Sequence, residues 1–391
     1  MALVHPVLAL ALVIVAGIGV TRLSRPALRR PALLDDLLAT GAPFLLLGLL
    51  LGPGLGVVDA AGLQLLEPVV ALAIGWIGAL FGARLEWRMV RRISRRTWSI
   101  GATLAVPVLL VTTVMALVLA RALSPLAQSW GHPSLPVALA LGGALTTAAS
   151  QRGPRLGRRN ALIDTLFGTA AVAIAVALYH PHFAVRSIVL TLLAAGLLGG
   201  VFVALAHGGV LRTPADASIA AFAVILCGAG FSYAAGLSPF VVCGLEAAIF
   251  MSFAPAAVRR AVAGLLSRWD GALFAAFLII AGALLRPMTV WVLLAALILA
   301  LLRVLVRWVT VRFGLDQVDP VWRSLPFAPP PEFAHSTIHQ GASAIALAAG
   351  FDLVRGGTGA ILVTVLVSVM AAEAIASLTP LTARPRPAEV S

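Results

Sequence analysis

The chain has 391 residues, of which 61% are hydrophobic and 11% charged, and its mean hydropathy is +1.03. Soluble domains contain roughly 45–50% apolar and about 25% charged residues, so this composition excludes an ordinary soluble protein. The net charge of +13 comes from arginine alone, since the sequence contains no lysine. These arginines lie mostly between apolar segments, as topology determinants do, which argues against a nucleic-acid partner.

Thirteen apolar segments follow one another along the chain, many of them close to the roughly 20 residues that cross a bilayer as a helix. They are 5–21, 39–57, 65–83, 98–121, 135–151, 161–179, 184–207, 217–235, 238–254, 269–285, 288–306, 338–352 and 357–378. We therefore predict an all-α integral membrane protein with about 13 transmembrane helices, built as one membrane domain over 1–381. A short cytoplasmic tail, 382–391, follows it.

The arginines also predict how the helices are oriented. With the N terminus outside, 24 of the 28 arginines fall on the cytoplasmic side, Arg303 and Arg307 among them. Because cytoplasmic loops are enriched in basic residues, we expect an external N terminus and a cytoplasmic C terminus. The first segment is predicted to be retained, since its first basic residue, Arg22, follows the apolar run. The arginine-rich, alanine-rich composition suggests a bacterial inner membrane.

Two connections stand out between the apolar segments. The arginine-rich stretch 84–97 is predicted to continue the third helix out of the membrane and to contact anionic lipid head groups. The stretch 312–337 contains Pro326 and Pro329–Pro331, which cannot occupy a helix interior. It is predicted to be a cytoplasmic linker between the eleventh and twelfth helices.

Ionisable residues inside apolar segments are candidates for function, because each is costly in lipid unless it is paired or solvated. Glu246 lies in the middle of the ninth segment and is predicted either to bind a proton or to be a neutral hydrogen-bonding acid. Glu373 is predicted to be structural. His339, at the start of the twelfth segment, is predicted to cap or pack more readily than to relay protons.

The fifth segment ends in small and hydroxyl-bearing residues, Gly142, Gly143, Thr146 and Thr147. Such a helix can unwind and offer carbonyl and hydroxyl oxygens to a cation, or it can pack closely against a neighbouring helix. The twelfth segment opens with His339-Gln340-Gly341, a similar glycine-interrupted start in the second half. Paired short segments of this kind are typical of a transporter's central binding site.

Six short motifs resemble, in the same order, those of the Kef/NapA-type monovalent cation/proton antiporters. They are GLLLGPGLG at 48–56, GALFGARLE at 78–86, GALTT at 143–147, GLSP at 236–239, FLIIAG at 277–282 and HQG at 339–341. The resemblance implies two inverted repeats, a mobile core in which the fifth and twelfth helices are unwound and cross, and a homodimer formed through the first helices. It also implies exchange of a monovalent cation for protons, without a cofactor.

The chain departs from that family in the sixth helix. In the stretch LFGTAAV at 166–172, Thr169 stands where the resemblance implies an essential aspartate. Threonine does not release a proton at physiological pH, so the usual chemistry cannot run through this position. Asp164, five residues earlier, could line the cytoplasmic funnel or pair with Arg158 or Arg159.

Arg303 falls where the family places a buried basic residue. It could neutralise Asp164, Glu246 or Glu373, or it could extend to the cytoplasmic interface. Arginine keeps its proton, so it is an unlikely proton carrier.

These observations favour a secondary transporter that exchanges a monovalent cation for protons. Two alternatives stay open: a divergent member that moves an anion or another solute, and a non-transporting scaffold or sensor subunit. The sequence has no Ser-His-Asp set, P-loop or metal-ligand cluster, so we predict no enzyme activity, no cofactor and no nucleic-acid partner. Membrane lipids are the other predicted partner.

Overall fold

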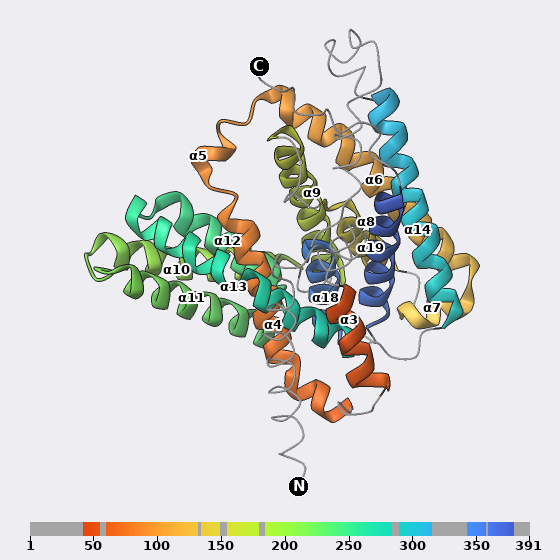
Figure 1. The fold of residues 1–391 in the computed structure, drawn as a ribbon, viewed down its shortest axis with the longest axis horizontal. Coiled ribbons are helices and arrows are strands. Elements are labelled where there is room, and N and C mark those ends of the chain that lie inside the picture. Colours follow the sequence, from red (N-terminus) through yellow and green to blue (C-terminus); the bar gives the residue numbers. More distant parts are fainter. Residues whose placement is uncertain are drawn as a thin grey trace, which may run out of the picture.

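The computed structural model describes residues 42–54, 60–131, 134–148, 155–179, 184–283, 289–314, 342–356 and 359–378, and the regular structure within them is helical throughout (Figure 1). The predicted first helix, the proline-rich linker after residue 314, His339, Gln340 and the C-terminal tail lie outside these ranges.

Helices coincide with every predicted apolar segment from the second onward. Their bounds are α3 Ala42–Leu49 with the π-helical turn η1 Leu50–Gly54, α4 Ala60–Ala83, α5 Trp87–Val90, α6 Arg95–Ala122, α7 Ser124–Trp130, α8 Leu135–Thr146, α9 Arg155–Tyr179, α10 Ala184–His207, α11 Pro214–Ala234, α12 Pro239–Phe253, α13 Ala256–Ala283, α14 Val290–Val309 with η3 Thr310–Gly314, α18 Ala342–Arg355 and α19 Ala360–Leu378. The all-α membrane architecture is confirmed, while the count of 13 stays a prediction because the first segment is not described.

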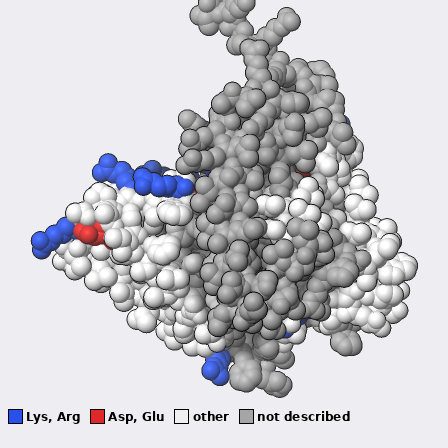
Figure 2. Space-filling view, turned by 60° about the horizontal axis from the view of Figure 1, so that its bottom comes forward, with Lys and Arg blue, Asp and Glu red and all other residues white. Residues whose placement is uncertain are grey.

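Six of the described helices are long and apolar enough to cross a membrane, namely α6, α9, α10, α11, α13 and α14 with η3. Their outer faces carry large exposed apolar side chains, for example Leu197 on α10 and Leu301 on α14. Arginine side chains visible in Figure 2 lie near the margins of the molecule and leave broad uncharged surface between them. This distribution fits a multi-pass protein whose apolar belt faces lipid.

The helices form two groups that lie side by side (Figure 1). In one group α4, α10, α11, α12 and α13 pack around a core that includes Trp76, Phe202 and Phe250. The other group contains α6, α8, α9, α14, α18 and α19, and its core includes Trp130, Leu141 and Phe351. Contacts of α4 with α18 join the two groups.

Glycines let α4 and α12 approach until their backbones touch. A Cβ atom added at Gly82 would meet the Gly244 carbonyl group, and one at Gly78 would meet the backbone of Phe240. The predicted GALFGARLE stretch thus supplies a packing surface of small residues, the usual device for close helix contact in lipid.

The segment after α4 corrects the prediction that this helix continues through 84–97. The helix ends at Ala83, a turn follows, and the short α5 precedes α6. Glu86 pairs with Arg259 of α13, and the backbone N–H of Trp87 donates to Ser252 Oγ at the end of α12, 2.9 Å away. These contacts turn the chain back onto its own helix group, which a straight extension could not reach.

The helix α13 begins 13 residues before the predicted start at residue 269. Val258, Val262 and Leu266 form a buried stripe at four-residue spacing, while Arg260 and Arg268 remain on the other side. An amphipathic first half of this kind has low mean hydropathy, so the apolar segment alone marked only the second half.

The short helices predicted near the centre are also present. At 1.5 Å per residue, the 12 residues of α8 extend about 18 Å and the 14 residues of α18 about 21 Å, less than the roughly 30 Å of hydrocarbon. The two helices pack against each other between α9 and α19 (Figure 1). Thr146 and Thr147 at the C-terminal end of α8 are fully buried, so the backbone groups there need partners inside the protein.

Candidate functional site: a buried arginine–aspartate cluster at the end of α8

The helix α8 ends abruptly inside the second helix group. Gly143 lies against the backbone of Gly168 in α9, and Gly142 faces Thr113 of α6, so small residues bring the three helices together. After Thr146 the backbone leaves the helix, with Thr147 extended at φ −62° and ψ 148°. The last carbonyl groups of a helix have no partner within it, so they must be satisfied from elsewhere.

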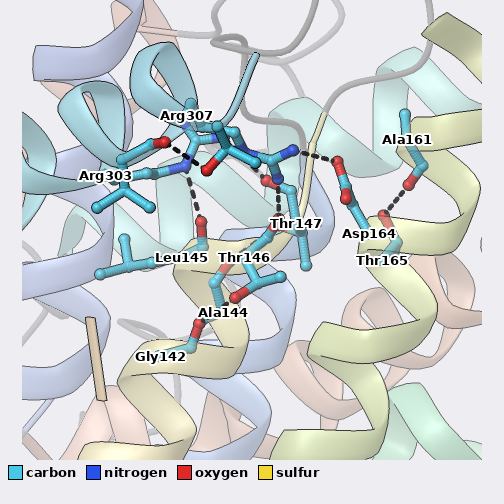
Figure 3. Close-up of polar contacts among 12 residues, drawn as sticks. Gly142, Ala144, Leu145, Thr146, Thr147, Ala161, Asp164, Thr165, Arg303 and Arg307 are labelled. Atoms are coloured by element: carbon cyan, nitrogen blue, oxygen red, sulfur yellow. Dashed lines mark hydrogen bonds and ion pairs between the residues drawn. The ribbon is translucent and has the colours of Figure 1, made fainter. Parts of the chain in front are cut away.

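Two arginines of α14 satisfy them (Figure 3). Arg303 donates from Nε to the Leu145 carbonyl oxygen at 2.7 Å and from Nη2 to that of Thr147 at 3.2 Å. Arg307 donates from Nη2 to the Thr146 carbonyl oxygen at 2.8 Å. Residues four apart share one helix face, and a cation at a helix C terminus is favoured by the helix dipole.

Asp164 of α9 completes the cluster. Its Oδ2 lies 2.8 Å from Nη1 of Arg307, and both side chains are fully buried. Asp164 and Glu373 also act electrostatically on Arg303. The cluster therefore joins α8, α9 and α14 through charged groups that are kept away from lipid and water.

The threonine hydroxyl groups near this cluster donate back into their own helices. Thr146 donates to the Gly142 carbonyl at 2.7 Å, Thr147 to that of Ala144 at 2.9 Å, and Thr169 to that of Thr165 at 2.7 Å. The carbonyl oxygens predicted to meet a transported cation are bound to guanidinium groups instead. In this conformation the guanidinium groups of Arg303 and Arg307 take the place at the end of α8 that was predicted for a transported cation.

Comparison with solved structures finds the sodium/proton antiporter MjNhaP1 of Methanocaldococcus jannaschii. Its structure at pH 8 matches with a TM-score of 0.61 over 98% of this chain and 100% of the antiporter, at 14% identity. An electron-microscopy structure of the same antiporter matches with a TM-score of 0.63 over 99% and 100%, at 16% identity. The chain has the fold of a sodium/proton antiporter. No protein-family model matches the sequence, and no curated protein does.

The antiporter fold brings four of the predicted site residues together: Thr146, Thr147, Asp164 and Arg303. Thr169 lies one turn beyond Thr165, directly after Gly168, whose position touches the Thr147 side chain. Thr169 thus lies next in sequence to a residue that contacts the end of α8. His339 and Gln340 lie outside the described residues.

Arg307 is the member of the cluster that the sequence reasoning missed. It was counted with the cytoplasmic arginines, yet it is fully buried and is the partner of Asp164. Arg158 and Arg159 were predicted for that role, but Arg159 is exposed. The available signal was the four-residue spacing of Arg303 and Arg307, which puts both on one face of an otherwise apolar helix.

Arg303 is likewise buried and does not extend to the membrane interface, which removes one of its predicted alternatives. It donates to the carbonyl groups of Leu145 and Thr147 at the end of α8, and it does not pair with Glu246, whose carboxyl oxygens have no hydrogen-bond partner among the described residues. The reason is the length of α14: its last turns lie beside the broken end of α8, inside the protein.

Glu246 is fully buried on α12, and its carboxyl oxygens have no hydrogen-bond partner within the described part of the chain. It faces Gly228 of α11, where an added Cβ would touch the carboxyl group. An unpaired charge is expensive in such surroundings, so the predicted alternatives, a proton-binding group or a neutral acid at a helix contact, both remain open.

No group of three or more His, Cys, Asp or Glu side chains that could hold a metal ion occurs among the described residues. What the cluster at the end of α8 offers is an exchangeable ion pair. Its carboxylate can accept a proton or a cation, while its arginines keep their charge.

Proposed function

We propose that the protein is a secondary active transporter that exchanges a monovalent cation for protons. The observation that carries the proposal is the buried pair of Asp164 and Arg307 at the broken end of α8, within an antiporter fold. An ionisable pair at such depth is costly and is typical of an ion or proton pathway.

In this proposal Asp164 takes the working role that Thr169 cannot fill. The carboxylate pairs with Arg307 in the conformation described here and exchanges that contact for a bound cation or a proton during transport. Arg307 stays charged throughout, so binding either a proton or a monovalent cation at Asp164 raises the net charge of the cluster by one. The helix group that contains α8, α9 and α14 would then move relative to the group of α4 and α10–α13, and this movement would carry the site across the membrane.

A second candidate function is transport of an anion or another solute. This function is supported by the guanidinium groups of Arg303 and Arg307. They already donate hydrogen bonds to the carbonyl oxygens at the end of α8, so these oxygens are not free to bind a transported cation. Arginine is also the side chain best suited to bind carboxylate or phosphate groups. A non-transporting scaffold or sensor subunit is the outcome if neither class of solute moves.

The remaining features belong to the same proposal. We expect a bacterial inner-membrane protein with an external N terminus, a cytoplasmic C terminus and one membrane domain over 1–381. We also expect a homodimer through the first helices, which rests on the motif resemblance. Cross-linking in native membranes, followed by denaturing electrophoresis, would test the dimer.

The direct test is transport in proteoliposomes with an imposed pH gradient, comparing Na⁺, K⁺ and no cation. We expect cation-dependent proton flux in the unaltered protein and its loss in Asp164→Asn, which keeps the side-chain shape but cannot exchange a proton. Glu246→Gln tests a proton route through α12, and loss of flux there alone would move the working acid to that helix.

Asp216→Asn is the matched control, because it makes the same chemical change at a partly exposed position in the first turn of α11, away from the cluster. It should leave the flux unchanged. Flux that needs no cation, or none with any cation, would contradict the proposal. Anion uptake under the same gradient would favour the second candidate.

A further inference from the structure

Asn160 of α9 is the only asparagine in the chain, and it lies one helical turn before Asp164. Only 1% of the residue is exposed, and neither its amide oxygen nor its amide nitrogen has a hydrogen-bond partner in the part of the chain that the structure describes. Burying an amide without a partner costs roughly 2–7 kcal/mol. A buried polar group without a partner among the described residues needs an explanation, and a bound ion is one of them.

The geometry of α9 directs Asn160 toward the same side as Asp164. Four residues correspond to about 6 Å along the helix and about 40° around it, so both side chains share one face. Ile163, on the adjoining side, packs against Gly101 of α6. Asp164 meets Arg307 of α14. Around the circumference of α9, Asn160 therefore lies between Ile163, which faces α6, and Asp164, which faces α14.

Asp164 also has an unused oxygen. Its Oδ2 pairs with Arg307, whereas Oδ1 has no hydrogen bond among the described residues. The face of α9 therefore presents a carboxylate oxygen and an amide oxygen one turn apart. Carboxylate and amide oxygens are preferred ligands of hard cations.

We propose that Asn160 is a ligand of the transported cation and, with Asp164 Oδ1, forms its binding site on α9. The inference rests on the proposed cation exchange. An anion would also find donors here, the amide of Asn160 and Nε of Arg307, which has no partner in the described ranges. It would, however, lie beside the unused carboxylate oxygen and be repelled, whereas a cation would be attracted by that oxygen and would compete with Arg307 for the carboxylate.

The test compares Asn160→Leu, which has a similar shape without polar atoms, with Asn160→Ser, a smaller polar variant that burdens folding less. In the proteoliposome assay we expect both to raise the half-saturating Na⁺ concentration tenfold or more, with a maximal rate within about twofold. Binding of radioactive Na⁺ to the full-length protein in detergent should weaken in parallel. Ser238→Ala is the control, because it removes another buried polar group without a hydrogen-bond partner among the described residues, at the N-cap of α12.

The outcomes separate this inference from the proposed function. No cation-dependent flux in the unaltered protein would overturn the function, and absent Na⁺ binding would overturn the inference with it. Normal flux with an unchanged half-saturating concentration in both variants would overturn the inference alone. A fall in maximal rate without a change in half-saturation would also overturn it, since that is the result of a purely structural role.

Discussion

Arg303 and Arg307 bring two guanidinium groups into a fully buried position beside the end of α8. Removing such groups from water costs several kcal/mol each, and the structure offsets this cost in two ways. Three carbonyl oxygens at a helix C terminus accept their hydrogen bonds, and Asp164 supplies a countercharge. The same contacts hold α8, α9 and α14 together, so stability and the proposed transport share one set of residues.

At this residue scale we expect Asp164→Leu to lower the free energy of unfolding by about 3–5 kcal/mol, because it leaves the buried Arg307 without its countercharge. The double variant with Arg307→Met should lose less than the sum of the two single changes. Unfolding in mixed detergent micelles would measure all three.

The pair of Glu86 and Arg259 is the matched control for that cycle. Its side chains are 21% and 17% exposed, so Arg259→Met should cost only about 0–1 kcal/mol. Equal losses from the two pairs would show that burial does not set the strength of the Asp164 contact.

At the scale of the helices, close approach of α4 and α12 holds the first group together. Gly82 and Gly78 meet the backbone of α12 directly, with no room for a side chain between them. In lipid there is little hydrophobic driving force between helices, so van der Waals contact at such positions supplies much of the packing energy.

We therefore expect Gly82→Ala to destabilise the protein by roughly 1–3 kcal/mol, as overpacking generally does. The added Cβ would come within 2.7 Å of the Gly244 carbonyl carbon, and α12 would have to shift. Thermal unfolding in detergent, followed by size-exclusion chromatography of the heated samples, would measure the loss.

Gly200→Ala is the control within α10, where an added Cβ meets no atom within 4 Å. Alanine there should leave stability unchanged or raise it by about 0.4–1 kcal/mol, because it reduces the freedom of the unfolded chain. A similar loss at both positions would mean that helix packing is not the cause.

At the scale of the whole molecule, the arginine-rich connection around α5 and the end of α14 lie at one end, whereas α7 lies at the opposite end (Figure 1). Ser129 in α7 lies 3.5 Å from Thr289, measured between their hydroxyl oxygens, so the start of α14 lies at the α7 end. The distribution of basic residues makes the α5 end the predicted cytoplasmic end.

Single cysteines would test this orientation in a protein whose Cys227 and Cys243 are replaced by alanine. Gln128→Cys, exposed in α7, should react with a membrane-impermeant maleimide on intact cells. Arg92→Cys, exposed beside α5, should react only after the cells are opened. The reverse pattern would show that the N terminus is cytoplasmic.

The sequence by itself determined the positions of the helices from 39–57 onward. In α10 the predicted segment and the helix share both ends, 184–207. The sequence suffices for this purpose because a segment that crosses lipid must satisfy its own backbone hydrogen bonds and therefore forms a helix. The position of each helix can thus be read from the hydropathy of about 20 consecutive residues. The short central helices α8 and α18 could be recognised for the same reason, from their glycine-interrupted apolar runs.

Only the tertiary structure decided which charges meet. Asp164 has Arg158 and Arg159 close by in sequence, but its partner is Arg307 on another helix. Likewise Glu86 pairs with Arg259 of α13, beyond the end of α4 at Ala83, where the arginine pattern had predicted that the helix continues. Helix periodicity says which residues share a face, but the rotation and depth of each helix follow from packing against its neighbours. An arginine near a helix end can therefore be a cytoplasmic anchor or a buried partner, and the contacts of α8, α9 and α14 decide between them.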